Sequence, residues 1–544
     1  MKSPDKVSSK LRKVEKEIDN HYKSNPLVEL PFATAAWSLL AFAEFESLKQ
    51  VSNVSTSQEL ETQSDNFINE LKEPMFWLFR ACEQGGQIPS AYDDDVFQAS
   101  WDLFKLGKKY QWFEAAYTYA SNGLIKLELE GSTIQPAKEF FKGMEYQAYG
   151  RLIKAHQTDE GISLINVDDF HLVREAISSS VKVVEGNRFS YKMNPRMVSD
   201  VIKTMSPGYD MAFSLPPEWR FSRYSLGDFR KVFEAILAIA SIHFRAWRIA
   251  IEKECDNMGY LDCIYVPTCN ELLRRVARYS GVPDAKVLSI FDDLTYGNRG
   301  ILHPDPALQP LIKLNSNHYA IMPSLWMSLS PERNLTVILN RIPSEREIYA
   351  ELVGEQEELM KRRFTTDLST EGFQFIEGNV SSDLPDIDLA IIRDSEKACL
   401  LLELKWFIGP AEFREVIDKS KAIKKGVCQS LKFKQAFAAS HEPLLAKLGI
   451  DTDYRLETVV VSQNWIGYAN VQNLEVPVIL ADHLIAKLKA TESLRSTMDW
   501  LKNREYLPKE GKDFEVHGIT STIGKWNLKW STTRPLIKDA FFPL

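Results

Sequence analysis

The chain has 544 residues, too many for one hydrophobic core, so we expect about two to four domains. Its 44% hydrophobic and 26% charged residues are ordinary for a globular protein, while the net charge of −8 excludes a broadly basic nucleic-acid-binding surface. Any such surface must be a local patch.

The start of the chain and its longest apolar stretch carry no targeting or membrane signal. Met1–Asp5 has no apolar core and therefore predicts no signal peptide. The apolar run near residues 32–43 is shorter than the about 18 residues that a membrane-spanning helix needs. The six cysteines include no C-x-x-C pair, which favours reduced thiols over a metal site. We therefore expect a cytoplasmic protein with no membrane contact.

Residues 1–160 are predicted to form a helical N-terminal domain. After a charged leading segment, apolar and aromatic residues recur at helical spacing, as at Trp37 and Phe45. We interpret these aromatic residues as packed helix faces rather than as platforms for stacking bases. The acidic run Asp93–Asp95 is interpreted as the first turn of a helix and not as a metal site.

Residues 161–265 are predicted to be a mixed, mainly helical middle region. Val181–Val184 is a candidate strand. The segment Ser225–Asp228 has the spacing of a helix capping box, and an apolar stripe from Phe229 to Trp247 follows it. His243 lies near that stripe and is interpreted as a packed histidine rather than a ligand.

Residues 266–342 are predicted to form a winged-helix-like connecting module. Two helices are expected at residues 271–279 and 285–294, and the alternation around Asn315–Asn317 predicts a hairpin. Arginines on the first helix would be available for phosphate contacts, but a purely structural module between two domains fits the same elements. These arginines are Arg274, Arg275 and Arg278.

From residue 343 to residue 544 the pattern changes to alternating helices and strands, which predicts an α/β domain with a C-terminal extension. The expected strands are 373–376, 386–392, 400–406, 456–461 and 476–479, and the expected helices are 345–363, 411–439 and 481–490. The predicted fold class is therefore a mostly α-helical N-terminal region followed by a C-terminal α/β domain.

Two of these apolar strands carry charged residues. Asp388 stands at the start of the strand 386–392, and Glu403 and Lys405 are two residues apart near the end of the next strand. Side chains two residues apart lie on the same face of a strand. A charge on a buried strand costs several kcal/mol unless it is paired or binds a metal. Two acids and an amine on neighbouring strands predict a site for a divalent cation and a phosphate.

The order helix, three strands, helix, strand, with an Asp opening the second strand and Glu-x-Lys ending the third, resembles the PD-(D/E)xK nuclease superfamily. This is the fold of restriction endonucleases and RecB-type nucleases. The resemblance covers roughly residues 345–485. It implies that Asp388, Glu403 and the backbone carbonyl of Leu404 bind Mg²⁺, with Mn²⁺ as an alternative. It also implies that Lys405 orients the attacking water and stabilises charge on the phosphate.

Other acids near the motif leave alternatives open. Asp386 completes the literal Pro-Asp pair of the motif, but Asp388 directly precedes the apolar strand and is preferred, with Asp386 as the fallback or an accessory acid. Some family members add a glutamate from the preceding helix, for which Glu355 and Glu358 are the candidates here.

The helix expected at residues 411–439 is rich in lysine. Its lysines predict a local contact surface for a phosphate backbone, although a solvated helix face would have the same composition. The nucleic-acid-binding candidates are Lys421, Lys424, Lys425 and Lys432. Gln429 stands where RecB-like members place a catalytic glutamine close to the metal-binding acids. The tyrosine that often follows in those members has no counterpart, because Phe433 and Phe437 occupy that region.

The sequence therefore predicts a metal-dependent nuclease, with DNA as the expected substrate by resemblance and bacterial phage defence as a hypothesis by analogy of architecture. The alternatives are a catalytically silent nuclease fold that binds nucleic acid or serves in assembly, and an RNase with the same metal site. A homodimer or a protein partner could use the helical N-terminal region, but no residue supports either.

Overall fold

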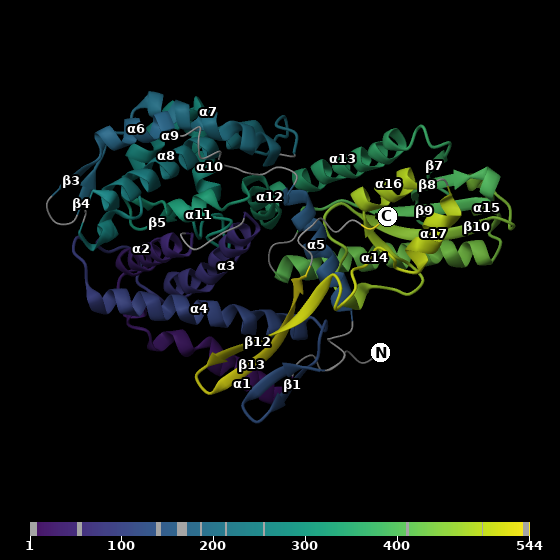
Figure 1. Cartoon of the computed structure of the whole chain (residues 1–544), viewed down its shortest axis with the longest axis horizontal. Helices are drawn as coiled ribbons and strands as arrows, with labels where there is room; N and C mark the ends of the chain where they lie inside the picture. Colours follow the sequence, from purple (N-terminus) through teal and green to yellow (C-terminus); the bar gives the residue numbers. More distant parts are fainter. Residues whose placement is uncertain are drawn as a thin grey trace.

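The computed structural model describes residues 8–51, 57–137, 143–159, 171–184, 188–212, 215–253, 256–409, 413–491, 493–536 and 543. Helices fill most of the chain up to residue 342, and a five-stranded sheet follows (Figure 1). The expected division into a mostly helical region and an α/β region is thus present. No helix in the described part of the chain is long and apolar enough to cross a membrane.

One hydrophobic core joins the helices between residues 22 and 342. At its centre lies α8 (Leu226–Glu252), where apolar residues face nearly all directions, so the helix is buried on most of its surface. The capping box expected at Ser225–Asp228 is present with both of its hydrogen bonds. The surrounding helices are α2 (Phe32–Val51), α3 (Ser57–Ala81), α4 (Asp94–Ser121), α6 (His171–Ser180), α7 (Pro195–Ala212), α9 (Cys269–Ser280), α10 (Asp284–Leu294), α11 (Pro323–Met327) and α12 (Pro331–Arg341).

Two local predictions in this region are confirmed. Asp93 caps α4 by accepting hydrogen bonds from two backbone N–H groups of the first turn, so the acidic run is a helix start. His243 is buried, with Nδ1 2.9 Å from the Tyr191 hydroxyl and Nε2 2.7 Å from the Asp262 carbonyl oxygen. Burial lowers the pKa of His243 to about 4, so it is a packed, neutral histidine.

The segment 266–342 has the predicted parts. Helices α9 and α10 are followed by a short hairpin of β5 (Ile312–Lys313) and β6 (Tyr319–Ala320). Buried residues of both helices belong to the same core as α8, so the segment is built into the helical region. Of its three arginines, Arg275 forms an ion pair with Glu271 at 2.6 Å.

The candidate strand near residue 182 is also present, as β3 (Lys182–Val184) paired with β4 (Arg188–Ser190).

A four-stranded sheet joins segments from both ends of the chain. Its order is β1 (Leu127–Glu130), β2 (Thr133–Pro136), β13 (Trp526–Pro535) and β12 (Phe514–Ile523), and α1 (Ser9–Asp19) and α4 pack on it (Figure 1). The helical spacing predicted for the N-terminal region is wrong at β1 and β2. β1 pairs with β2, and β2 pairs with β13, a partner almost 400 residues away that local periodicity does not reveal.

The C-terminal five-stranded sheet has the order β11 (Val478–Leu480), β10 (Arg455–Ser462), β9 (Ala398–Lys405), β8 (Ile387–Arg393) and β7 (Gln374–Gly378). β7, β8 and β9 are antiparallel, while β9, β10 and β11 are parallel. Side chains of β9 alternate between two packed layers. One layer contains α15 (Glu442–Leu448) and Phe433 of α14 (Phe413–Ala438). The other contains α16 (Ala481–Ala490), α17 (Leu494–Lys502) and α5 (Met144–Asp159), and Ile423 and Val427 of α14 also join it.

Candidate active site

The pairing of β8, β9 and β10 brings the charged strand residues to one place. Leu389 pairs with Leu402 in the antiparallel ladder, so Asp388 at the start of β8 lies beside Glu403 near the end of β9. Glu403 in turn pairs with Val460 of β10. The sheet therefore places Asp388 and Glu403 on adjacent strands, as the sequence pattern predicted.

Three short hydrogen bonds connect the predicted residues. The backbone N–H of Leu404 donates to Asp388 Oδ2 at 2.7 Å. Lys405 Nζ donates to Glu403 Oε1 at 2.6 Å and to the carbonyl oxygen of Leu404 at 3.0 Å. Asp388, Glu403, Leu404 and Lys405 therefore form one connected polar group.

Asp386, the alternative acid, has a different setting. Its side chain is exposed and accepts a hydrogen bond from Asn379 at 2.9 Å. Asp388 is half-buried on the strand and bonds directly to the β9 backbone. The geometry therefore favours Asp388 over Asp386 as the acid of this site.

Burial and like charge shift the pKa of each carboxyl in the group. Glu403 is 4% exposed, and burial together with nearby Asp388 raises its pKa, although Lys405 acts in the opposite direction. Burial also raises the pKa of Asp388 against the effect of the Leu404 N–H and Lys405. For Lys405, burial disfavours the charge, but Glu403 and Asp388 outweigh it and raise the pKa above its ordinary value. Lys361 also favours the charged form of Asp388, but Lys405 is the only one of the two lysines that hydrogen-bonds to a carboxylate of the group.

A third carboxylate comes from α13 (Pro343–Asp367), and it is Glu357 rather than either predicted glutamate. Glu357 Oε1 accepts from the backbone N–H of Trp406 at 3.4 Å. Burial raises the pKa of Glu357, with Lys405 lowering it and Asp388 raising it further. By contrast, Glu355 is exposed and Glu358 pairs with Lys361 at 2.9 Å.

The prediction of Glu355 or Glu358 therefore missed the glutamate that reaches the site. The overlooked signal in the sequence is which positions of α13 face the core. Met360 and Phe364 are two of the buried positions of α13, and Glu357 precedes them by three and seven residues on the same helix face.

Helix α14 packs closely over the charged group at Gly426. A Cβ atom at this position would lie 3.1 Å from Glu403 Cγ, 3.3 Å from Val460 Cγ1 and 3.4 Å from Lys405 Cε. Such contacts are tighter than most side chains tolerate, so a glycine allows the helix to approach the site. One turn further on, Gln429 Oε1 is buried and accepts no hydrogen bond from the described residues. An unsatisfied buried oxygen near two carboxylates is the kind of atom that a bound ligand satisfies.

The predicted lysines occupy two different flanks of α14. At 100° per residue, Lys421, Lys425 and Lys432 fall on one flank, next to Gln429, whereas Lys424 points away from it. The opposite flank faces β10, because Lys434 there pairs with Glu457 at 2.8 Å. The flank that carries Lys425 and Lys432 is therefore the one on the side of β8.

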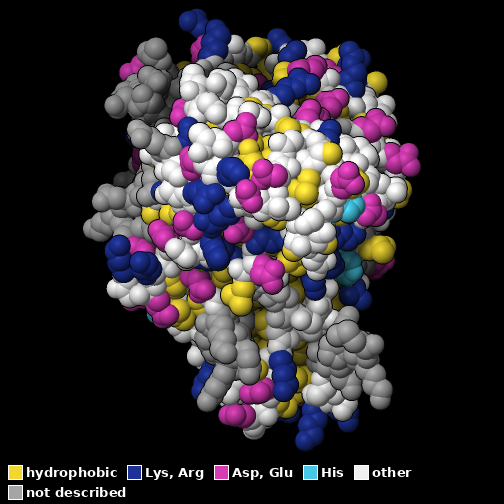
Figure 2. Space-filling view, turned by 90° about the vertical axis from the view of Figure 1, so that its right-hand side faces the viewer, with side chains coloured by type: hydrophobic (Ala, Val, Ile, Leu, Met, Phe, Trp, Pro, Cys, Tyr) yellow, Lys and Arg dark blue, Asp and Glu magenta, His cyan; other side chains and the backbone are white. Residues whose placement is uncertain are grey.

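Ion pairs divide these lysines further. Lys421 pairs with Asp418 at 2.9 Å, while Lys424, Lys425 and Lys432 are exposed and pair with none of the described acids. The end of the molecule formed by the α/β region shows basic and acidic side chains interspersed rather than one continuous basic face (Figure 2). A nucleic-acid contact here would therefore be narrow and local.

The donor atoms of Asp388, Glu403 and Leu404 indicate whether these residues could bind a divalent cation. Within the described ranges, no group of three or more His, Cys, Asp or Glu side chains is disposed to hold a metal ion. The oxygens of Asp388, Glu403 and the Leu404 carbonyl are nevertheless the hard donors that Mg²⁺ prefers. Two of them, on Glu403 and Leu404, already share the positive charge of the Lys405 ammonium. The donor set therefore suits a cation.

Comparison with protein-family models, with curated proteins and with solved structures gave no match for this chain.

Proposed function

We propose that the α/β region is a metal-dependent phosphodiesterase, an endonuclease that acts on DNA. The observation that carries this proposal is the connected group of Asp388, Glu403 and Lys405 on adjacent buried strands. Three carboxyls with raised pKa surround one lysine, so the site lacks positive charge. A divalent cation would supply that charge and could bind the substrate phosphate.

The arrangement of elements supports the same proposal. Apart from the short helix α15 between α14 and β10, the order α13, β7, β8, β9, α14, β10 is the helix, three strands, helix and strand order of the PD-(D/E)xK resemblance. The central strands β8 and β9 carry the charged group, and α14 lies over it.

Each residue would have a defined role in hydrolysis. Asp388, Glu403 and the Leu404 carbonyl would hold Mg²⁺ or Mn²⁺, which polarises the phosphate and lowers the pKa of bound water. Lys405 keeps a proton at Nζ, because its pKa is raised, and its ammonium can stabilise negative charge that develops on the phosphate. Gln429 offers a buried carbonyl oxygen for orienting water, and Glu357 adds a further carboxylate.

The substrate would approach along the flank of α14 that carries Lys425 and Lys432. Lysines without acid partners attract a phosphate backbone without reading its sequence. DNA as the substrate rests on the family resemblance.

A second candidate function is nucleic-acid binding without catalysis. The Lys405 ammonium contacts two of the oxygens expected to bind metal, so in this arrangement the lysine itself neutralises the site. Calorimetry with Mg²⁺ and Mn²⁺ separates the two functions. Metal binding that Glu403→Gln abolishes supports the nuclease, and its absence in the wild-type protein supports the silent fold.

The deciding experiment incubates supercoiled plasmid, single-stranded DNA and total RNA with the protein and Mg²⁺, Mn²⁺ or EDTA. We expect metal-dependent cleavage of DNA, and Asp388→Asn or Glu403→Gln should reduce it by on the order of a hundredfold or more. Asp386→Asn is the matched control, because Asp386 lies two residues from Asp388 but outside the charged group. Cleavage that survives Glu403→Gln would overturn the catalytic assignment, and preferential cleavage of RNA would identify an RNase.

A further inference from the structure

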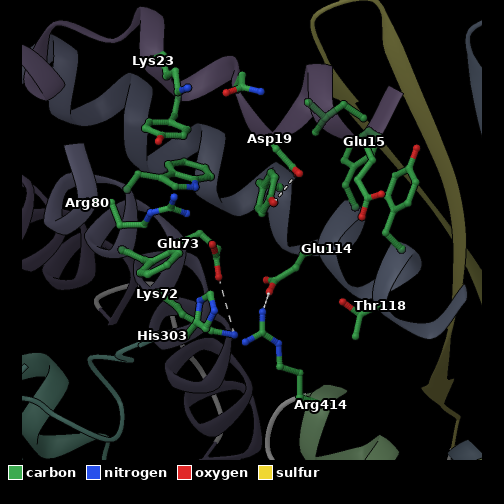
Figure 3. A pocket seen from close by; sticks show the side chains of 18 of the residues that line it. Glu15, Asp19, Lys23, Lys72, Glu73, Arg80, Glu114, Thr118, His303 and Arg414 are labelled. Atoms are coloured by element: carbon green, nitrogen blue, oxygen red, sulfur yellow. Dashed lines mark hydrogen bonds and ion pairs between the residues drawn. The ribbon is translucent and has the colours of Figure 1, made fainter. Parts of the chain in front are cut away.

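A cavity of about 350 Å³ lies between α1, α3, α4 and the first turn of α14 (Figure 3). This volume is at the lower end of the roughly 300–1,000 Å³ typical of small-molecule pockets, which favours a small ligand over a segment of polymer. The described residues that line it include none of the candidate active site. The cavity is therefore a separate candidate binding site.

One side of the cavity has two exposed cations and a histidine whose pKa is lowered by burial and by nearby arginines. Lys23, Arg80 and His303 line this side, on the left of Figure 3. Lys23 and Arg80 form no ion pair with the described acids, and the Arg80 guanidinium lies 5.4 Å from the centre of the Phe76 ring. The His303 ring centre lies 5.0 Å from that of Phe76, so imidazole and guanidinium share one aromatic support.

Deeper in the cavity the charges are balanced. Lys72 lies 3.9 Å from Glu73, and Arg414 from the first turn of α14 forms a 2.8 Å ion pair with Glu114. Burial and the nearby Glu114 raise the pKa of Glu73, which reduces the negative charge of this inner group near neutral pH. The surplus positive charge at Lys23 and Arg80 therefore remains available to an anion.

The other side of the cavity is aromatic and acidic. Tyr110, Phe113 and Tyr117 of α4 supply ring surfaces, and Glu15 and Asp19 of α1 supply carboxyl groups. Aromatic rings offer faces or edges to a planar heterocycle. Carboxyl oxygens accept hydrogen bonds from hydroxyl and amino groups. The cavity thus has a cationic end and an end suited to a planar group with hydrogen-bond donors.

We propose that this cavity binds a nucleoside monophosphate, with the phosphate at Lys23, Arg80 and His303 and the nucleoside along the aromatic and acidic side. A phosphate monoester carries close to two negative charges at neutral pH, which matches the two cations without acid partners. Asp19 already accepts from the Tyr110 hydroxyl at 2.8 Å, and a ribose hydroxyl or exocyclic amine can donate to its second oxygen or to Glu15. This proposal is independent of nuclease activity, because it concerns binding alone.

The test is titration calorimetry of the full chain with AMP, GMP, CMP and UMP, followed by the NMR titration of His303. We expect at least one mononucleotide to bind with Kd below about 1 mM. Burial and the nearby arginines lower the pKa of free His303, so a bound phosphate should raise it. Lys23→Ala and Arg80→Ala should each weaken binding by about tenfold or more.

Controls separate the parts of the ligand and of the site. The matched nucleoside and inorganic phosphate should each bind at least about tenfold more weakly than the nucleotide. Lys10→Ala removes an exposed lysine of α1 outside the cavity and should leave the affinity unchanged. The proposal is wrong if no mononucleotide binds, if phosphate alone binds equally well, or if Lys23→Ala and Arg80→Ala bind like the wild-type protein.

Discussion

The helical core and the central sheet both bury carboxylates, but with different partners. In the helical core, Asp293 is 1% exposed and accepts hydrogen bonds from Arg223, Arg299 and the Tyr224 hydroxyl. In the sheet, Asp388, Glu403 and Glu357 approach one another around a single ammonium group. In the first region Arg223 and Arg299 together serve Asp293 and the neighbouring Asp292. In the second region Lys405 faces three acids, and only Asp388 also feels the positive charge of Lys361.

This difference distinguishes buried acids that stabilise the fold from buried acids that are candidates for catalysis. Glu332 pairs with Arg230, and Glu345 accepts from the side chain and backbone of Ser222, so these buried acids of the helical core have donors of their own. A buried acid with its own donors holds elements together. Acids that repel one another on adjacent strands destabilise the fold unless a cation joins them. That excess of negative charge is why the sheet, and not the helical core, is the candidate catalytic centre.

The largest expected contrast is in stability. Asp293→Ala leaves Arg223 and Arg299 with only Asp292 as an acid partner and removes the acceptor of the buried Tyr224 hydroxyl, so it should lower the free energy of unfolding by about 2–4 kcal/mol. Glu403→Gln removes repulsion in metal-free buffer and should leave stability unchanged or higher. Urea unfolding at pH 8 in EDTA measures both, because burial raises the pKa of Asp293 only to about 6 and the acid is ionised there. Equal losses in the two variants would mean that Glu403 is a structural acid.

Glu44 of α2 is a third kind of buried acid, because none of the described cations pairs with it. It is fully buried, accepts from the backbone N–H of Ser324 at 3.0 Å, and has a pKa raised by burial to about 8. Below the ordinary value of 4.5 the folded and unfolded chains are both protonated, so burial of the acid adds no pH dependence there. Between 4.5 and about 8 only the unfolded chain loses the proton, so stability falls as pH rises through that window.

Glu44→Gln should remove this pH dependence. At pH 8 the variant should be more stable than the wild type by on the order of 2–4 kcal/mol, and the advantage should shrink toward pH 5. Thermal unfolding across that pH range measures the difference. A variant that is less stable at every pH would show that the Glu44 carboxylate is ionised and held by its donors.

Gly426 tests whether close packing of α14 positions the charged group. In Gly426→Ala the added methyl group would press on Glu403 and Val460, which should cost about 1–3 kcal/mol of stability and reduce cleavage more than it reduces DNA binding. The control is Gly354→Ala on α13, where a Cβ meets no atom within 4 Å and replacement of a helical glycine should stabilise slightly. Unchanged cleavage by Gly426→Ala would show that the close packing of α14 is not needed for activity.

The core of this site could be predicted from the sequence because it depends on local rules. Alternation along a strand places Glu403 and Lys405 on one face, and an acid at the start of the neighbouring apolar run places Asp388 beside them. The same rules predicted the five strands of the C-terminal sheet and helices α13, α14 and α16, but not α15, α17, β12 or β13. They did not select Glu357, because α13 is rich in glutamate and only its buried positions fix the phase of the helix.

These local rules could not predict long-range packing. The pairing of β13 with β2 joins residues near opposite ends of the chain, and Tyr149 of α5 packs under the C-terminal sheet beside His483. Neither contact leaves a periodic signal in the segment that makes it. The cavity that Arg414 shares with α1, α3 and α4 is formed in the same way, by elements separated by hundreds of residues.

The same comparison can be made for the cations, and substituting them should give the smallest effect of the predicted variants. In the helical core Arg223, Arg230 and Arg299 pair with acids, whereas Lys424, Lys425 and Lys432 of α14 pair with none of the described acids. Lys425→Ala and Lys432→Ala lie on the flank beside Gln429, and each should weaken duplex DNA binding in EDTA by about two- to fivefold. Each should also reduce the slope of log K against log salt by about 0.9 if it contacts one phosphate.

Lys424 is the matched control for that last prediction. It is adjacent to Lys425 in sequence, equally exposed, and 100° away around the helix, so it points away from the flank beside Gln429. Lys424→Ala should change the affinity and the salt slope less than Lys425→Ala does. If all three variants lose affinity equally, the lysines act as a diffuse positive field around α14. If only Lys425→Ala and Lys432→Ala lose it, the backbone of the nucleic acid follows one flank of the helix toward Asp388 and Glu403.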